Sequence, residues 1–449
     1  MAATPAQAGA LQLSPASIRM EQDAETIFVT SDRQPLRFIA QAVQAALNRS
    51  PDIEQAAASQ RAAQQELDNA RWNRWPKLQA QAGSGAYRLG GQSQRRDTSK
   101  PNLGLSVSTT VFDWGRTGHD IDSREHTMFA AGENLRHNQE RTALLTTVAL
   151  IQMGKHRQLS AVADAYAARM SELVNMLSDI VAVDRGRASE LVQARAKLLQ
   201  ALTERDTVAA QSIEWEIKLR QLTGAAAAEV PLQEHWPLSP PPIADTLSWM
   251  AGSPQVMQAV QEEQAARAQA HAQRAAAWPQ LNWVVGKQYE NDAYGQRTPW
   301  QTQLTLTYTL QGGSSLAAAA AAVERSAAAA AHKERVLLDL EIQVRTAHAK
   351  AVASLARVAD YVQMGAQTDQ VRRMYFEQWH HLGRRSLLEV LTAESEHHHA
   401  LTSSVHSRFE AYLAIIDMHA GAGRLLSWIA SLESDGSVMQ ARGKGRLPH

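Results

Sequence analysis

The sequence contains no cysteine and carries no net charge. Of its 449 residues, 45 are basic and 45 are acidic, so the formal net charge at pH 7 is zero. Without cysteine there is no disulfide, no thiolate metal ligand, no thiol nucleophile and no acylated N-terminal cysteine. Without an excess of positive charge, the chain lacks the electrostatic footprint of a nucleic-acid-binding protein. We therefore expect no nucleic acid among its partners.

Long apolar runs are missing as well. No segment approaches the roughly 18 consecutive apolar residues of a membrane-spanning helix. Residues 1–10 are small and uncharged, and they lack the basic start and apolar run of a secretory signal peptide. Two expectations stay open: a cytosolic protein, or an exported chain whose signal has been removed.

Proline is absent from two long stretches. All 15 prolines lie outside residues 102–230 and 300–447. A proline inside a helix costs about 3 kcal/mol, so these stretches can form very long helices. A helix over residues 116–181 would be roughly 100 Å long at about 1.5 Å per residue. Prolines cluster between the stretches, and residues 231–246 are therefore predicted to form an extended linker.

The chain also repeats itself. Four landmarks recur in one order, at offsets of 203, 203, 198 and 197 residues (253 − 50, 278 − 75, 310 − 112 and 383 − 186): Ser50-Pro51 with Ser253-Pro254, Trp75-Pro76 with Trp278-Pro279, Phe112-Asp113-Trp114-Gly115 with Leu310-Gln311-Gly312-Gly313, and Gly186-x-x-Ser189 with Gly383-x-x-Ser386. This order indicates a tandem duplication with a period too long for a solenoid. We divide the chain into an N-terminal segment (1–35), a first repeat (36–230), the linker (231–246), a second repeat (247–432) and a C-terminal tail (433–449).

Each repeat is predicted to hold a long helix and then a shorter one. The ranges are 116–181 and 190–223 in the first repeat, and 316–380 and 387–432 in the second. In the first long helix, apolar residues recur at coiled-coil spacing: Leu159, Val162, Tyr166, Met170, Leu173, Leu177 and Ile180. The second long helix begins with an alanine-rich run over 317–331, which we interpret as a close helix contact rather than low-complexity filler.

Two segments, 102–112 and 300–310, alternate apolar with uncharged polar residues and are predicted to be β-strands. Each follows a second predicted strand, which gives hairpins over 78–112 and 281–310. A strand of about 10 residues is long enough to cross a membrane. A half-buried hairpin in a soluble fold would alternate in the same way. Tryptophans near the strand ends favour the membrane, whose interfaces are rich in aromatic residues: Trp75, Trp278, Trp283 and Trp300.

Two hairpins supply too few strands for a closed barrel. An open sheet edge in lipid would leave backbone groups unpaired at several kcal/mol each. Membrane insertion therefore requires at least two chains to pool their hairpins, as eight strands in a dimer or twelve in a trimer. The strand count by itself does not choose between them.

The duplicated order resembles the TolC-like outer-membrane channel proteins of Gram-negative bacteria. The resemblance covers residues 36–429 and rests on the succession helix, hairpin, long helix, shorter helix, on Pro76-Lys77-Leu78 and residues 112–116 at the edges of the first hairpin, and on the two Gly-x-x-Ser sites. It implies a mainly α fold with a membrane β-barrel: a homotrimer whose 12-stranded outer-membrane barrel continues as a long periplasmic α-helical coiled-coil tunnel. It also implies contact with outer-membrane lipid and a location in the bacterial outer membrane with a periplasmic extension.

The same resemblance implies a passive exit duct that docks with a periplasmic adaptor (membrane fusion) protein and an inner-membrane transporter. Many drug-efflux members carry an acylated cysteine, and its absence here favours type I secretion. The pump would then be an ABC transporter and the cargo a protein toxin or adhesin, for example a repeat-in-toxin protein such as adenylate cyclase-haemolysin. The alternatives are a tripartite small-molecule (drug) efflux pump and, from another class, a soluble coiled-coil scaffold.

The resemblance places both Gly-x-x-Ser sites at the periplasmic tip, as turns that contact the adaptor: Gly186, Ser189, Gly383 and Ser386. From the residues alone, each glycine is expected to end a long helix and each serine to cap the next one. A plain helix-turn-helix without a gating role is the alternative.

The resemblance also implies a pore constriction or gate near the second glycine. Glycine spacing carries the first acidic residue of that gate to Glu389 and the latching arginine to Arg385. The second acidic position falls on Thr392, so the sequence departs from the pattern there. A solvated helix residue is the other interpretation of Glu389.

No catalytic pattern competes with a transport function. The sequence His397-His398-His399 looks like a metal site, but consecutive helical residues point about 100° apart and cannot converge on one ion. No phosphate loop or nucleophile elbow is present. We expect a protein that is not an enzyme and uses neither metal nor cofactor.

Overall fold

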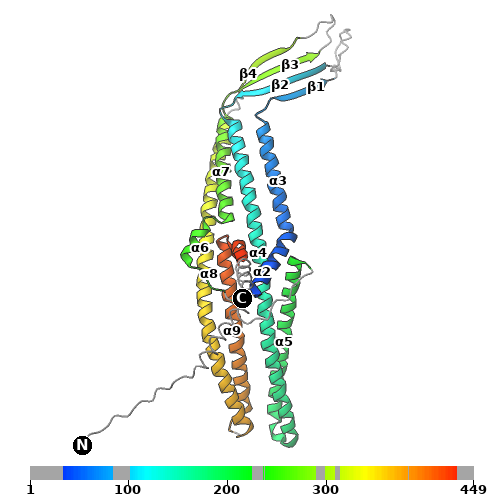
Figure 1. Ribbon diagram of the computed structural model, residues 1–449, viewed down its shortest axis with the longest axis vertical. Coiled ribbons are helices and arrows are strands. Elements are labelled where there is room, and N and C mark those ends of the chain that lie inside the picture. Colours follow the sequence, from blue (N-terminus) through cyan, green and yellow to red (C-terminus); the bar gives the residue numbers. More distant parts are fainter. Residues whose placement is uncertain are drawn as a thin grey trace, which may run out of the picture. The chain divides into compact units, whose positions relative to one another are not determined.

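The computed structural model describes residues 34–83, 102–224, 236, 238–289, 299–308, 314–382 and 384–431. The elements, labelled as in Figure 1, follow in this order: α2 (Gln34–Arg49), α3 (Pro51–Trp72), β1 (Lys77–Gly83), β2 (Asn102–Phe112), α4 (Arg116–Val183), the 3-10 helix η1 (Arg185–Arg187), α5 (Ala188–Thr223), α6 (Ile243–Met250), α7 (Pro254–Ala275), β3 (Gln280–Tyr289), β4 (Gln301–Thr307), α8 (Ser314–His380) and α9 (Leu387–Gly421). Both repeats show the predicted succession of helix, two strands, long helix and shorter helix.

The long helices form where proline is absent. Helices α4 and α8 contain 68 and 67 residues. The prediction for the last helix was wrong at its end, because α9 stops at Gly421 and not at residue 432. Gly423 adopts a φ of 63°, a left-handed conformation that ends a helix, and residues 425–431 form a separate helical segment. Among the described helices, none combines the length and apolar character needed to cross a membrane.

The four strands form one antiparallel sheet in the order β1-β2-β3-β4. Strand β2 pairs with β3, for example Val107 with Val285, so the hairpins of the two repeats are joined edge to edge. A register shift between Thr110 and Phe112 marks a bulge near the end of β2. The predicted hairpin turns at 84–101 and 290–298 lie outside the described residues, as do positions 309–310 of the predicted last strand.

Two compact units divide the chain differently from the repeats. Unit 1 comprises Met1–Ser50, Glu140–Ser248 and Gln343–His449, and unit 2 comprises Pro51–Gln139 and Trp249–Ile342. Helices α4 and α8 each pass from one unit into the other, so each unit draws on both repeats. The sheet lies entirely in unit 2. The Gly-x-x-Ser sites fall in unit 1.

Unit 1 contains two apolar clusters. The first joins α2, α4, α5, α8 and α9 around Phe409 and Tyr412, and it includes Trp236 of the predicted linker. The backbone N–H of Trp236 donates to the Tyr412 hydroxyl at 3.0 Å. The second cluster, called the tip cluster below, contains Met170, Leu173 and Leu177 of the predicted coiled-coil stripe. Burial of this stripe confirms the predicted coiled-coil face of α4.

In unit 2, polar contacts hold α7 against its neighbours. The Ser123 hydroxyl of α4 donates to the Ala265 carbonyl of α7 at 3.0 Å, and the buried Glu263 carboxylate of α7 pairs with Lys333 of α8 at 2.9 Å. In the alanine-rich run of α8, Ala319 and Ala322 are buried, whereas several others are exposed in the single chain, among them Ala317, Ala318, Ala320, Ala321, Ala327 and Ala328. The predicted close contact thus forms within the chain at part of the run.

Candidate functional site

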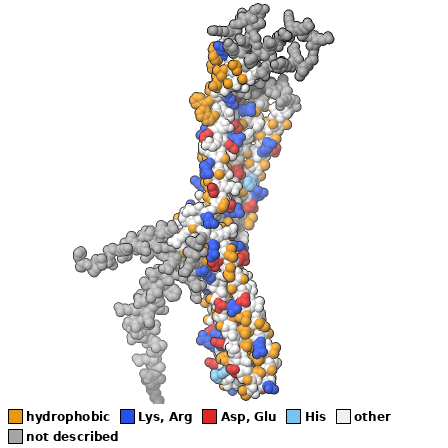
Figure 2. Space-filling view, turned by 90° about the vertical axis from the view of Figure 1, so that its right-hand side faces the viewer, with side chains coloured by type: hydrophobic (Ala, Val, Ile, Leu, Met, Phe, Trp, Pro, Cys, Tyr) orange, Lys and Arg blue, Asp and Glu red, His pale blue; other side chains and the backbone are white. Residues whose placement is uncertain are grey.

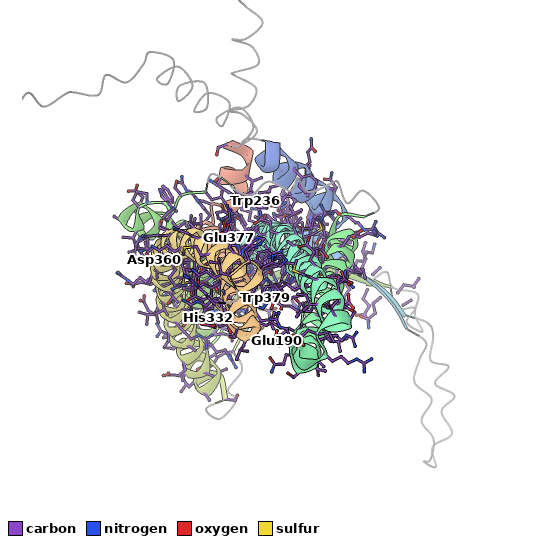
Figure 3. The ribbon with its side chains drawn as sticks, turned by 90° about the horizontal axis from the view of Figure 1, so that it is seen from below. Glu190, Trp236, His332, Asp360, Glu377 and Trp379 are labelled. Atoms are coloured by element: carbon purple, nitrogen blue, oxygen red, sulfur yellow. The ribbon has the colours of Figure 1, made fainter. Side chains whose placement is uncertain are left out.

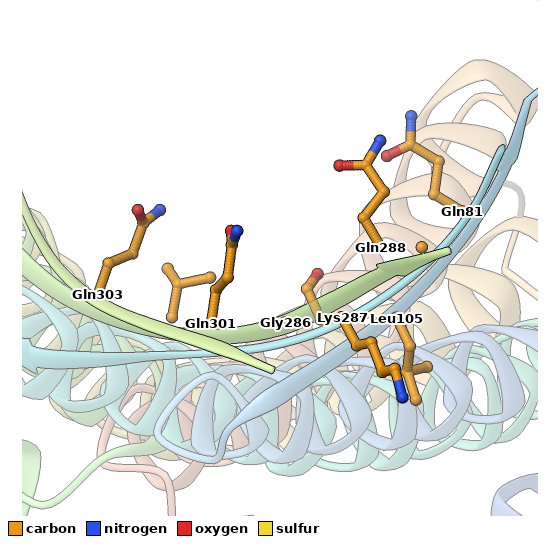
Figure 4. Close-up of a pocket in the computed structure, with 10 residues that line it drawn as sticks. Gln81, Leu105, Gly286, Lys287, Gln288, Gln301 and Gln303 are labelled. Carbon is orange, nitrogen blue, oxygen red and sulfur yellow. The ribbon is translucent and has the colours of Figure 1, made fainter. Parts of the chain in front are cut away.

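The two faces of the sheet differ in polarity, because the register places alternate residues of each strand on one side. One face, called the polar face, carries mainly uncharged polar side chains, with Lys77 and Val284 as exceptions: Gln79, Gln81, Ser106, Ser108, Thr110, Asn282, Gln288, Gln301, Gln303 and Thr305. The other, called the apolar face, carries mainly apolar side chains, with Thr109, Lys287 and Thr302 as exceptions: Leu78, Ala80, Ala82, Leu103, Leu105, Val107, Trp283, Val285, Leu304 and Leu306. Figure 4 shows Leu105 on the side of the sheet opposite to the glutamines Gln81, Gln288, Gln301 and Gln303.

The apolar face is exposed in the single chain. Leu78, Leu304 and Leu306 each expose 67% or more of their surface. Soluble monomers rarely present a contiguous apolar surface of this kind, and a membrane-facing sheet does so by necessity. The exposure favours lipid contact over the half-buried hairpin that the alternation also allowed.

The tryptophans lie at both ends of this face. Trp75 and Trp278 precede β1 and β3 at the end of the sheet next to the helices, and Trp300 precedes β4 at the other end. Because Gly286 pairs with Gln301, Trp300 is level with residue 287, nine residues along β3 from Trp278 (287 − 278). Nine residues span roughly 30 Å at about 3.3 Å each, or about 23 Å with a strand tilt of about 40°. That height matches the ~25 Å apolar band of outer-membrane barrels.

The remaining predicted aromatic residue lies between the two ends. Trp283 projects from the apolar face near the helix side of the sheet, and its indole N–H donates to the Thr302 hydroxyl at 2.8 Å. At the helix-side end, Trp114 packs against Trp278 with ring centroids 5.2 Å apart and the ring planes tilted by 37°. Trp114 was not among the predicted interface residues, although it belongs to the Phe112-Asp113-Trp114-Gly115 landmark.

That landmark turns the chain from β2 into α4. Trp114 and Gly115 have φ values of 58° and 82°, a pair of left-handed residues. Asp113 accepts hydrogen bonds from the backbone N–H groups of Gly115 and Thr117, at 3.1 and 2.9 Å, and thereby caps the new helix. Burial acts to raise the pKa of Asp113, but the hydrogen bonds from Thr117 and Gly115 outweigh it and lower the pKa.

The predicted gate residues meet at the start of α9. Ser386 is the N-cap, and with Glu389 it forms a capping box: the Ser386 hydroxyl accepts from the Glu389 N–H, and the Glu389 carboxylate accepts from the Ser386 N–H at 2.9 Å. The other carboxylate oxygen of Glu389 forms an ion pair with Arg385. The Arg385 guanidinium also lies 4.3 Å from the ring centroid of Tyr375. Ser386 is therefore a helix cap, as predicted.

These contacts define the charge state of Glu389. Hydrogen bonds from the Ser386 backbone and the Arg385 guanidinium lower its pKa below the usual value of 4.5. Both carboxylate oxygens are thus used inside one chain, although the side chain stays 40% exposed. Thr392 occupies the position where the resemblance implies a second acidic residue. Its hydroxyl donates to the Leu388 carbonyl of the same helix at 2.8 Å.

The turn between α4 and α5 is built differently, and two cap predictions were wrong there. Helix α4 ends at Val183, and Asp184 caps the following η1 by accepting from the Gly186 N–H at 2.9 Å. Gly186 therefore sits inside η1 rather than ending α4. Ser189 lies in the first turn of α5, whose N-cap is Arg187. Asp184 does the capping because its short carboxylate reaches the N–H two residues ahead. Gly383, in the other turn, lies outside the described residues.

The ends of the two turns share a surface pattern. Val183 and Leu382 are exposed aliphatic residues, and each is followed two positions later by an exposed arginine, Arg185 or Arg384. A further arginine in each turn pairs with a glutamate of the next helix: Arg187 with Glu190 at 2.9 Å, and Arg385 with Glu389.

Trp379 anchors α8 to the α4–α5 turn. It is 3% exposed, packs in the tip cluster, and lies with its ring centroid 5.6 Å from the Arg187 guanidinium. Figure 3, seen from below, labels Trp379 and Glu190, the two residues that Arg187 contacts. Sequence reasoning missed this tryptophan.

A buried ion-pair network was missed as well. The Glu394 carboxylate of α9 accepts from Arg169 of α4 at 2.8 Å and lies 3.4 Å from Arg372 of α8. Arg169 also stacks on Phe376, 4.5 Å from the ring centroid. Burial acts to lower the pKa of Arg169, but hydrogen bonds to Glu394 and Glu172 outweigh it and raise the pKa. Arg169 lies 225 positions before Glu394 in the sequence (394 − 169), with no local signal linking them.

The three consecutive histidines diverge. His397 lies 3.1 Å from the Thr368 hydroxyl, whereas His398 stacks on Tyr166 and contacts Glu204 at 2.9 Å. Within the residues that the structure describes, no group of three or more His, Cys, Asp or Glu side chains is arranged to hold a metal ion.

Comparison with known proteins finds a matching family model over part of the chain and solved structures of the same fold. Residues 42–225 match the family model described as outer membrane efflux protein. The chain is 24% identical over 123 residues to the outer membrane efflux protein BepC of Brucella suis biovar 1 (strain 1330), and the aligned segment spans 27% of either protein.

Solved structures match nearly the whole described fold. The outer membrane protein VceC of Vibrio cholerae is 17% identical with a TM-score of 0.76, over 87% of this chain and 98% of VceC. The CmeC outer membrane channel of Campylobacter jejuni is 14% identical with a TM-score of 0.75, over 89% of each chain. The open MtrE outer membrane channel of Neisseria gonorrhoeae is 18% identical with a TM-score of 0.72, over 86% and 89%.

The chain has the fold of the TolC-like outer-membrane channel proteins. The predicted family resemblance, the mainly helical fold and the location in the outer membrane with a periplasmic extension are confirmed. The matching model describes outer membrane efflux proteins and the matching structures are membrane channels, in agreement with the prediction that the protein is not an enzyme. The roles predicted for individual site residues stay predictions.

Proposed function

We propose that three copies of this TolC-like chain form an exit duct through the outer membrane. The observation that carries the proposal is the four-stranded sheet with one polar and one apolar face. Three such sheets supply twelve strands (3 × 4), and closing them side by side would remove the free edges of β1 and β4. The apolar faces would then meet lipid and the polar faces would line the lumen.

Exposed apolar side chains on α5 support contact between copies in unit 1. Val192, Leu199, Ile213 and Ile217 are exposed and recur at intervals of 7, 14 and 4 residues, which places them on one side of the helix. Figure 2 faces the side of Figure 1 on which α5 lies and shows apolar side chains gathered along these lower helices. A stripe of this spacing is suited to packing against a neighbouring helix of another copy.

The periplasmic adaptor is proposed to dock at the two tip turns, which contain Gly186, Ser189, Gly383 and Ser386. The exposed pairs Val183 with Arg185 and Leu382 with Arg384 support a contact that is both apolar and charged. We also propose Glu389 and Arg385 as the gate. Their ion pair fixes the first turn of α9, so opening the pair would free one carboxylate per chain to face the pore.

The gate has a matched control in the first repeat. Glu389→Gln should change the cation selectivity or conductance of the reconstituted channel, because the carboxylate is removed from the constriction. Glu190→Gln breaks the equivalent ion pair with Arg187 and should leave selectivity unchanged. Equal effects of both variants would show that they act through tip stability rather than through the pore.

For the cargo, we propose a secreted protein delivered by an inner-membrane ABC transporter, the function that the absence of cysteine favours. Small-molecule efflux is the second candidate, and the description of BepC as an efflux protein favours it. Deleting the gene in the source bacterium separates them. Loss of one or more proteins from the culture medium with unchanged drug susceptibility supports protein export, and the reverse pattern supports efflux.

The duct itself is tested by the native mass of the protein extracted from outer membranes in detergent. A trimer would have a protein mass of about 148 kDa (3 × 49.2). A monomer or dimer recovered from the soluble fraction would contradict the duct. The hairpins would then be interpreted as part of a soluble coiled-coil scaffold.

A further inference from the structure

A hollow of about 410 Å³ lies on the apolar face of the sheet, near the end away from the helices. Its lining is mostly apolar and crosses from β1 over β2 to β3: Ala80, Ala82, Leu103, Leu105, Lys287 and Trp300. The hollow arises because the side chains of Ala80 and Ala82 are small, whereas neighbouring positions of the apolar face carry leucine or valine.

Lys287 brings a positive charge to this face. The register pairs Lys287 with Leu105, and Figure 4 shows both on the side opposite to the glutamines. Among the described side chains of the apolar face, Lys287 is the charged one. Its ammonium lies 5.8 Å from the ring centroid of Trp300. A cation on a lipid-facing surface is costly unless it reaches the membrane interface or a negative partner.

The position of the hollow along the strands indicates which leaflet of the membrane it faces. The helices follow or precede the ends of the strands at Lys77, Phe112, Gln280 and Thr307, whereas Lys287 lies near the opposite end of β3. The helices form the periplasmic extension, so the Lys287 end reaches the outer surface of the membrane. The outer leaflet there consists of lipopolysaccharide, whose lipid A carries phosphate groups on an acylated sugar backbone.

We propose that this hollow is a binding site for lipid A of the outer leaflet. Lys287 pairs with a phosphate at the interface, Trp300 flanks the sugar backbone, and an acyl chain fills the space over Ala80 and Ala82. Charge complementarity and the apolar lining select this occupant. A second copy of the chain would join through the edges of β1 and β4, in the plane of the sheet, and leaves the face free. The inference rests on the proposed outer-membrane duct.

The test is a titration of the purified full-length trimer with diphosphoryl lipid A, followed by native mass spectrometry. Lys287→Ala should weaken lipid A binding by about tenfold, since hydrogen bonds to charged groups contribute at least a factor of ten. Lys287→Arg should restore it. Ala82→Leu fills the hollow and should also weaken binding. Lys77→Ala, which removes a lysine from the polar face, should have no effect.

Dephosphorylated lipid A and phosphatidylglycerol complete the titration. Equal binding of phosphorylated and dephosphorylated lipid A, or equal binding by wild type and Lys287→Ala, would overturn the site. Binding of phosphatidylglycerol as tight as lipid A would overturn the choice of ligand. Failure of the duct looks different, because the wild-type chain would then not be recovered as a membrane trimer at all.

Discussion

The guanidinium of Arg169 on α4 donates to the carboxylate of Glu394 on α9 at 2.8 Å, and Glu394 is 3% exposed. Arg372 of α8 approaches the other oxygen of the same carboxylate at 3.4 Å. One buried acidic group thus connects three helices of unit 1. Because both arginines are partly buried, the charge of Glu394 balances theirs where water has limited access.

The first prediction concerns this carboxylate. Glu394→Ala should lower the free energy of unfolding by about 3 kcal/mol, because it leaves two arginines without their buried partner. Thermal melting of the detergent-extracted protein, followed by circular dichroism, measures the change. Glu172→Ala is the matched control: Glu172 also binds Arg169, at 2.9 Å, but it is exposed, so its loss should cost less than about 1 kcal/mol. Similar shifts for both variants would contradict a special role of the buried pair.

Features with a local or periodic signal could be predicted from the sequence. The proline-free stretches became α4 and α8, the apolar stripe with Met170 and Leu173 became a core, and period-two alternation became a sheet with two different faces. Proximity of Arg385, Ser386 and Glu389 was also predictable, because they are neighbours in the chain.

Features that depend on long-range packing could not be predicted. Glu394 looks like any acidic residue of a helix until α4 and α8 bring two arginines to it. In the first tip turn the Gly-x-x-Ser pattern predicted a cap at Ser189 and gave no sign of η1, whose cap is Asp184 through the N–H of Gly186. The pairing of β2 with β3 could not be predicted either, because it joins strands of different repeats. The sequence pattern of each repeat predicts only the hairpin within that repeat.

The second prediction is acid lability of the gate turn. The lowered pKa of Glu389 means that its ionised form stabilises the folded turn. That contribution is fully present above the unfolded pKa near 4.5 and is lost as the pH falls through the lower folded pKa. Hydrogen-exchange protection of residues 386–390, corrected for intrinsic rates, should fall between pH 6 and pH 3. In Glu389→Gln it should already be low at pH 6 and change little; a drop as large as in wild type would refute the assignment.

The third prediction concerns His419, which is 7% exposed and stacks on Trp428 at 4.8 Å. Burial lowers its pKa from 6.5 to about 4. Between pH 6.5 and pH 4, His419 is protonated in the unfolded chain and neutral in the folded chain. The free energy of unfolding therefore falls as the pH drops through this range, by up to about 3 kcal/mol. His419→Phe keeps an aromatic ring and should shrink the difference in melting temperature between pH 7 and pH 5. His399→Phe, at an exposed position of the same helix, should leave that difference as it is.

The fourth prediction separates the two faces of the sheet. Leu304→Arg puts a charge on the apolar face, midway between the levels of Trp278 and Trp300, and should cost about 2–4 kcal/mol if that face meets lipid near the bilayer centre. Thr305→Arg introduces the same side chain one position later, on the polar face, where a water-filled lumen would accept it. The amount of folded trimer in isolated outer membranes, detected by its resistance to unfolding in cold detergent, measures both. Loss for Leu304→Arg with near-normal assembly for Thr305→Arg is expected, because neighbouring residues of the strand face lipid and water in turn. Equal loss in both variants would mean that the polar face is also packed against protein, and equal tolerance would mean that the apolar face never enters lipid.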